Sequence, residues 1–269
     1  MNLRSELLVA LTDGGDEDPL YCVHPVSGSV YGYLGLARSL GGSPPVVGIE
    51  ASGFDTDLAP AATVGEQSAE YVRALPPAAA YHLLGWSMGG LVAFDMAHRI
   101  MEAGRAVGSL ILIDTPVPTW AEPPPEAALL ERFLCDMFGT PTLADAGLAE
   151  VFAGLPDPVE PIRLFTRLAG SDMGLDTDGI DPDFLLRRYA VFRANVVAAV
   201  DYRISDPYPG VLAHISGSVT ASDPSAWEPF AAKLEYHVVP GNHFTIWAGA
   251  GLAEISRIVR DYVGASNVT

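Results

Sequence analysis

The sequence contains few cysteines and few basic residues, and both shortages exclude classes of protein. Cys22 and Cys135 are the only cysteines in 269 residues, so no disulfide framework supports the fold. We expect two reduced thiols and a cytoplasmic location. Lys and Arg number 15 against 33 Asp and Glu, for a formal net charge of −18. Because such a surface repels nucleic acid and anionic membranes, we expect neither as a partner.

Long apolar runs are also absent. No apolar segment approaches the roughly 20 residues needed to cross a bilayer. Residues 1–11 carry charge within their apolar part and lack a small-residue cleavage pattern, so we expect no signal peptide. The Asp-rich segment 171–182 lacks the twelve-position calcium pattern that ends in Glu. We therefore expect no bound metal ion.

Apolar strand patterns alternate with helical patterns over most of the chain. Hydrophobic residues make up 49% of the sequence, enough for the core of one large domain spanning 1–269. The alternation favours a mostly parallel central sheet flanked by helices. The predicted strands are 6–11, 20–23, 45–49, 81–84, 110–113, 211–216 and 234–239; the predicted helices outside the central insertion are 31–40, 63–75, 91–102, 227–233 and 249–262.

The alternation stops after residue 114. Residues 115–126 are rich in proline, and helical patterns follow at 127–138, 161–168 and 184–200 without a strand among them. We interpret an insertion at about 120–202 as a helical lid over the active site. The alternative is a set of ordinary helices packed on the flank of the sheet.

One segment has the features of a catalytic turn. Residues 81–90, Tyr-His-Leu-Leu-Gly-Trp-Ser-Met-Gly-Gly, join an apolar strand to a helix through a Gly-x-Ser-x-Gly turn. Glycines at 85 and 89 allow the tight packing of a nucleophile elbow. A serine hydroxyl needs such exposure, a nearby base and oxyanion donors to act as a nucleophile. We predict Ser87 as the nucleophile of an α/β-hydrolase fold; the alternative is a glycine-rich turn with a solvent-facing serine.

The base and the acid should follow the serine in the sequence. His243 lies in a glycine-led loop after the last strand, whereas His214 and His237 lie inside strands. His243 is therefore the predicted base. Asp114 and Asp223 each follow a core strand, and either could hold the imidazole.

Two backbone amides complete the predicted site. In this fold one oxyanion donor is the residue after the nucleophile, and the other lies in a loop after an earlier strand. That strand ends here in His-Pro-Val-Ser-Gly at 24–28, so Val26 and Met88 are the predicted donors. His24 could be taken as a second base, but we interpret it as a residue that braces the loop.

Taken together, these motifs resemble the type I thioesterase domains at the end of nonribosomal peptide synthetases and related polyketide hybrids. The resemblance implies that Asp114 rather than Asp223 is the acid and that the helical insertion is a lid. Trp86 is typical of the peptide-synthetase branch, whereas stand-alone editing thioesterases usually carry His there. Asn242 and residues 245–247 depart from the common pattern, which makes the product harder to infer. The resemblance covers nearly the whole chain and is carried by residues 24–28, 31–40, 85–90, 112–114 and 241–244.

The resemblance also implies the reaction. A peptidyl or acyl carrier protein domain would deliver a peptidyl or acyl chain as a phosphopantetheine thioester, which Ser87 accepts and releases by hydrolysis or macrocyclisation, as in antibiotic biosynthesis. The enzyme would need no cofactor of its own, and we expect a monomer when it is isolated. The alternative function is a stand-alone esterase or type II editing thioesterase that acts on small acyl groups.

Arginines gather in the predicted lid. One hypothesis is that some of them face the acidic carrier domain or the acyl chain. The alternative, which we favour, is a solvated helix face with neighbouring Asp. These residues are Arg163, Arg167, Arg187, Arg188 and Arg193.

Overall fold

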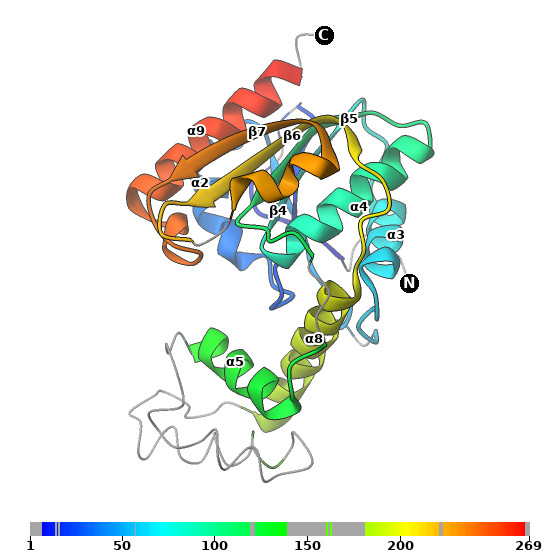
Figure 1. The fold of residues 1–269 in the computed structure, drawn as a ribbon, viewed down its shortest axis with the longest axis vertical. Helices are drawn as coiled ribbons and strands as arrows, with labels where there is room; N and C mark the ends of the chain where they lie inside the picture. Colours follow the sequence, from blue (N-terminus) through cyan, green and yellow to red (C-terminus); the bar gives the residue numbers. More distant parts are fainter. Residues whose placement is uncertain are drawn as a thin grey trace.

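Seven strands form one sheet in the order β1-β3-β2-β4-β5-β6-β7 (Figure 1). The computed structural model describes residues 7–266 except 14, 16, 57, 119–121, 139–159, 161, 163–180 and 221–222. Strand β1 pairs with β3 in the antiparallel sense, and the other neighbours are parallel. The strands are β1 (Leu8–Ala10), β2 (Leu20–Val23), β3 (Val46–Ile49), β4 (Tyr81–Trp86), β5 (Val107–Ile113), β6 (Tyr208–Gly217) and β7 (Ala231–Val239).

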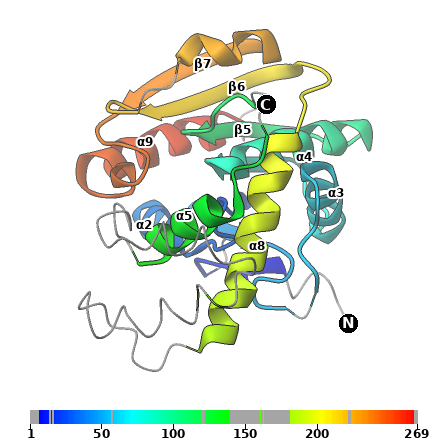
Figure 2. The same ribbon diagram turned by 60° about the horizontal axis from the view of Figure 1, so that its bottom comes forward.

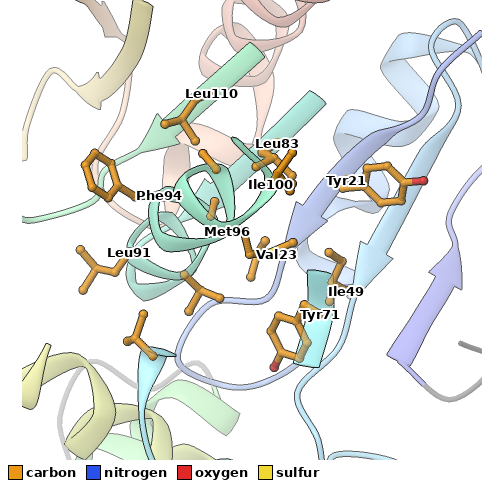
Figure 3. Packing of buried hydrophobic residues seen from close by; sticks show 14 of the residues in the cluster. Tyr21, Val23, Ile49, Tyr71, Leu83, Leu91, Phe94, Met96, Ile100 and Leu110 are labelled. Atoms are coloured by element: carbon orange, nitrogen blue, oxygen red, sulfur yellow. The ribbon is translucent and has the colours of Figure 1, made fainter. Parts of the chain in front are cut away.

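Helices cover both faces of the sheet, so the central strands are apolar on both sides. On one face lie α3 (Val64–Ala74) and α4 (Met88–Glu102), whose core is drawn in Figure 3. On the other face lie α2 (Leu34–Leu40), which follows the short 3-10 helix η1 (Tyr31–Tyr33), and α9 (Gly249–Ser266).

Strand β5 shows how the sheet separates these two cores. Its residues alternate between them, with Leu110 and Leu112 on the α3–α4 face and Ile111 and Ile113 on the other face. This alternation explains why the buried strands appear in the sequence as continuous apolar runs.

Local signals set several helix ends. At the start of α3 the Thr63 side chain accepts from the Glu66 N–H, and the Glu66 carboxylate accepts from the Thr63 N–H, so the two residues form a capping box. Helix α2 ends at Gly41, whose φ of 68° is the left-handed conformation favoured at a C-terminal cap.

One predicted helix was placed too far along the chain. Residues 227–233 were expected to be helical, but a 3-10 helix, η3 (Pro224–Phe230), begins earlier and covers only their first part, because β7 begins at Ala231. Ala231 pairs with Tyr208, and Lys233 pairs with Val211. Pairing with β6 therefore overrides the helical preference of Ala-Ala-Lys.

The helices α5 (Glu126–Phe138) and α8 (Pro182–Asp201) lie together below the sheet in the view of Figure 1, and Figure 2 shows them side by side. They share a small apolar core of their own, and α8 also contacts α3 and α4. We call this pair the cap. Of the predicted helix 161–168 only Ile162 lies among the described residues, and segment 171–180 lies outside them. None of the helices in the described ranges combines the length and apolar character that a bilayer span requires.

Candidate active site

Ser87 occupies the turn between β4 and α4 in a backbone conformation that few side chains adopt. Its φ is 57° and its ψ is −129°. Such a conformation costs of order 1–3 kcal/mol and persists only where the surroundings hold it. Here the Ser87 N–H donates to the carbonyl of Ile113 at 2.9 Å, and the Ser87 carbonyl accepts from the Gly90 N–H at 3.1 Å. Strand, turn and helix are thus fastened around the serine, as the motif predicted.

The glycines that flank Ser87 are required by close backbone contact. A Cβ atom at position 85 would overlap the carbonyl oxygen of Gly89. A Cβ atom at position 89 would stand 2.5 Å from the carbonyl oxygens of Val23 and His24. The elbow therefore packs directly on the end of β2, which brings the loop after β2 to the serine.

Asp114 lies at the carboxyl end of β5 and contacts His243. The distance from Asp114 Oδ2 to His243 Nδ1 is 3.4 Å, and the carboxylate is fully buried. Three further groups donate to it: Ser216 Oγ at 3.0 Å, the Gly217 N–H at 2.8 Å and Thr220 Oγ1 at 2.9 Å. Burial raises the pKa of Asp114, but the hydrogen bonds from His243, Gly217, Thr220 and Ser216 together lower it by more than burial raises it. The pKa of Asp114 therefore falls below its usual range.

Asp223, the other candidate acid, is placed differently. It lies at the start of η3, where its carboxylate accepts from the N–H of Ser225 at 2.9 Å and from the Ser225 hydroxyl at 2.7 Å. The side chain is exposed and caps the 3-10 helix. Of the two aspartates, Asp114 is thus the one that the fold brings to His243.

His243 lies in the loop after β7, beside the elbow. Its ring centroid is 5.1 Å from that of Trp86, the residue before Ser87. The loop is tightened by Asn242, whose side-chain oxygen accepts from the N–H groups of Phe244 at 3.0 Å and Thr245 at 2.9 Å. The asparagine that departs from the common family pattern therefore has a local role in holding the histidine loop.

Two other histidines lie away from this site. His214 is buried within β6 and contacts the carbonyl of Thr115 at 3.1 Å, while His237 contacts the hydroxyl of Tyr262 at 2.9 Å. Burial lowers the pKa of both.

Met88 and Val26 lie on two segments that meet at the elbow. Met88 is the first residue of α4, where an N–H has no acceptor within the helix and lies at the positive end of the helix dipole. Val26 lies in the loop that Gly89 packs against. An oxyanion formed at Ser87 would find donors of the required kind on both segments.

His24 braces the loop of Val26, as we interpreted it. Its Nδ1 lies 2.8 Å from the carbonyl oxygen of Pro25, and its Nε2 lies 2.7 Å from the hydroxyl of Tyr71. Because a carbonyl only accepts, Nδ1 carries the proton and Nε2 accepts from the tyrosine. Burial lowers the pKa of His24 to about 4, so the ring is neutral near pH 7. A neutral, buried imidazole holds the loop instead of acting as a second base.

The cap arginines within the described ranges mostly have partners in the chain. Arg193 pairs with Glu126 of α5 at 2.9 Å. Arg188 is buried, pairs with Asp55 at 2.6 Å and lies over the ring of Phe54. Arg188 therefore tethers α8 to the loop after β3, which neither interpretation of these arginines foresaw. Arg187 is exposed, and Arg163 and Arg167 lie outside the described residues.

Several residues of the site escaped the sequence interpretation. Ser216 and Thr220 were not predicted because nothing near them in the sequence marks them as partners of an aspartate. Their position beside a predicted acid follows only once β6 is paired with β5.

Within the described ranges, no group of three or more His, Cys, Asp or Glu side chains is arranged to hold a metal ion.

Comparison with known proteins identifies the family. The model of the Thioesterase domain family matches residues 18–262. A dimodular nonribosomal peptide synthase of Bacillus subtilis (strain 168) is 36% identical over 112 residues, which is 40% of this chain and 5% of that protein. A probable non-canonical nonribosomal peptide synthetase, CymA, of Salinispora arenicola (strain CNS-205) is 27% identical over 272 residues, 97% of this chain and 3% of that protein. The chain thus spans a small fraction of the curated relatives it matches.

A solved structure supports the fold. The Vlm2 thioesterase domain, bound with a dodecadepsipeptide, superposes with a TM-score of 0.67 at 22% identity, covering 94% of this chain and 96% of that one. The parallel sheet with its antiparallel edge, flanking helices and nucleophile elbow is the predicted α/β-hydrolase fold. The match over residues 18–262 confirms the resemblance, and the chain belongs to the Thioesterase domain family.

Proposed function

We propose that this chain is a chain-releasing serine thioesterase. It takes a peptidyl or acyl chain from the phosphopantetheine thioester of a carrier protein onto Ser87 and releases that chain by hydrolysis or macrocyclisation. The observation that carries the proposal is the strained elbow of Ser87, set beside His243 and the buried, ionised Asp114. The place of the relatives within peptide synthetases supports a carrier as the donor.

In the first half-reaction Ser87 Oγ attacks the thioester carbonyl while His243 takes the hydroxyl proton. Asp114 holds the imidazole with its proton on Nδ1 and stabilises the imidazolium that forms. The N–H groups of Val26 and Met88 stabilise the negative charge on the carbonyl oxygen by hydrogen bonds. Collapse of this intermediate breaks the carbon–sulfur bond, and the leaving thiolate takes the proton from His243. The products are the acyl-serine and the free carrier thiol.

The second half-reaction reverses these roles. Water, or a hydroxyl or amine within the acyl chain, attacks the ester carbonyl while His243 takes its proton. The same two N–H groups stabilise the oxyanion, and Ser87 Oγ leaves with the proton from His243. Water gives a linear acid, and an internal nucleophile gives a ring.

The surroundings of the base suit an extended, partly apolar acyl chain. Phe244 is 63% exposed, although it packs edge-on against both His243 and Trp86. An exposed aromatic ring beside the reacting groups offers apolar surface to the chain and displaces water near the ester. This feature favours a carrier-bound chain over a small acyl group.

The test is product analysis by mass spectrometry with peptidyl thioesters, both carrier-tethered and free, alongside short-chain esters. We expect the highest kcat/KM with the tethered thioesters and a product that is the linear acid or a ring lighter by one water. The Ser87→Ala variant should release neither. Faster turnover of short esters than of any carrier-tethered thioester would favour the stand-alone esterase instead.

A further inference from the structure

A buried pair of side-chain amides connects the cap to the loop of Val26. Asn195 of α8 and Gln67 of α3 are 1% and 2% exposed. Asn195 Nδ2 donates to the carbonyl of Val26 at 3.0 Å. Gln67 Nε2 donates to Asn195 Oδ1 at 2.9 Å. A helix of the cap and a helix of the core therefore meet at one peptide group of the loop after β2.

The chemistry of these groups allows one arrangement. The carbonyl of Val26 can only accept a hydrogen bond, so Asn195 must present its NH2 group to it. The Asn195 oxygen then faces Gln67, which must present its own NH2 group. Reversing either amide would set two acceptors or two donors against each other in a buried place, which is costly. The pair is thus a rigid support for the Val26 carbonyl.

This support completes a two-sided hold on Val26. The peptide before it, Pro25–Val26, is anchored through the carbonyl of Pro25, which accepts from His24 Nδ1 at 2.8 Å and from the Gly28 N–H at 2.9 Å. The peptide after it is anchored through the carbonyl of Val26 by Asn195. The Val26 N–H lies in the first of these planes, which is held by His24 and Gly28 of the same loop. The two planes are joined at the Cα of Val26, so the bond from Asn195 to the second plane restrains rotation of the first from outside the loop. Without Asn195 only the bonds within the loop hold the first plane.

We infer that Asn195 is a positioning residue for the oxyanion hole, and that docking of the cap helix α8 aims the Val26 N–H at the reacting carbonyl. This inference rests on the proposed function, in which Val26 donates to the oxyanion. Val26 also packs against both the α3–α4 core and the cap core. The cap is therefore coupled to the oxyanion loop by apolar contact as well as by the hydrogen bond.

Three variants of the full chain test the inference. Asn195→Leu keeps the approximate shape and removes the donor. The double variant Asn195→Leu/Gln67→Leu removes both amides together, so that neither is left buried without its partner, and it guards against a loss of folding. Tyr189→Phe is the matched control, because it removes a hydrogen bond from α8 to Glu126 that stays inside the cap.

The readouts separate positioning from general structure. One is kcat and KM for a peptidyl thioester; another is the affinity for a trifluoromethyl ketone analogue, which bonds to the serine and places an oxyanion in the hole. The third is the affinity for an unreactive amide analogue, which reports ground-state binding. Thermal unfolding checks that each variant is folded.

We expect both Asn195 variants to lose roughly 10- to 100-fold in kcat, less than the 10²–10³ typical for outright loss of a donor. The affinity for the ketone should fall by the same factor, while KM and the affinity for the amide analogue change by less than about 2-fold. Tyr189→Phe should stay within about 2-fold of wild type in all readouts.

Two results would overturn the inference: Asn195 variants with wild-type kcat and ketone affinity, or an equal loss of affinity for the ketone and for the amide analogue. A wild-type chain that neither hydrolyses the thioester nor bonds the ketone at Ser87 would overturn the proposed function instead, before any variant is compared.

Discussion

Replacing Asp114 by asparagine alters the proposed acid while keeping its shape. The carboxylate accepts from the Gly217 N–H and the Ser216 hydroxyl at Oδ1, and from the Thr220 hydroxyl at Oδ2, where His243 Nδ1 lies 3.4 Å away. An asparagine can accept at one of these two positions only. The Gly217 N–H can only donate, so it keeps the asparagine oxygen, and the new NH2 group faces His243.

That NH2 group imposes the wrong tautomer on the base. It requires a lone pair at His243 Nδ1, which moves the proton to Nε2, where the ring can no longer accept from Ser87. The same change in the template serine protease costs about 10⁴ in kcat, about 5 kcal/mol of transition-state stabilisation. The Thr220 hydroxyl can rotate to accept from the new NH2 group, so the site keeps its shape. We expect a fall of about 10³–10⁴ in kcat with little change in KM.

The assay is release of free thiol from a peptidyl thioester, followed for wild type, Asp114→Asn and Asp223→Asn. Asp223 caps η3 by accepting from the Ser225 N–H, and asparagine caps helices about as well, so this control should stay within about 2-fold of wild type. If Asp114→Asn kept more than a tenth of the wild-type kcat, or if Asp223→Asn lost more, the assignment of the acid would be refuted.

Three further predictions concern the stability of the fold. Burial is the main cause that raises the pKa of Glu50 from 4.5 to about 7. Its contribution to stability is present below pH 4.5 and is lost as the pH rises through 7. The free energy of unfolding of Glu50→Gln, measured in urea, should therefore match that of wild type at about pH 4.5 and exceed it by about 3 kcal/mol at about pH 8. Parallel pH profiles of the two proteins would contradict this. Thr63→Ala loses its bond to the Glu66 N–H and should lower the free energy of unfolding by about 1 kcal/mol; an unchanged urea midpoint would speak against the cap. Gly85→Ala overlaps the Gly89 carbonyl and should cost more than about 4 kcal/mol in thermal denaturation, whereas a wild-type Tm would disprove the close packing.

The parts of the site that the sequence could predict are those with local chemical signals. A Gly-x-Ser-x-Gly turn between an apolar strand and a helix requires close packing at both glycines, and the structure has it. His243 could be selected as the base because His214 and His237, the other histidines considered, lie inside strands. The capping box at Thr63 depends on two residues three positions apart.

The choice between Asp114 and Asp223 had no local signal. Both follow core strands, so spacing treats them alike. The pairing of Ile113 with Ile215 places Ser216 and Gly217 beside Asp114 and surrounds that carboxylate with donors. Which strands are neighbours depends on the whole sheet, so no local pattern in the sequence could indicate these donors.

The support of the Val26 loop is still less visible in the sequence. Gln67 and Asn195 are 128 positions apart, and each lies on the buried face of its helix, where an isolated polar residue carries no indication of its partner. Hydrogen bonds between distant elements depend on how the helices dock, and neither helical periodicity nor turn chemistry encodes that docking.

The central claim is that the chain being released is carried on Ser87. The most direct measurement is peptide mapping by mass spectrometry after the protein has reacted with a carrier-tethered peptidyl thioester and been quenched in acid. We predict an acyl adduct on the peptide that contains Ser87, and neither adduct nor released product with Ser87→Ala. An adduct on another residue, or normal release by Ser87→Ala, would contradict the account.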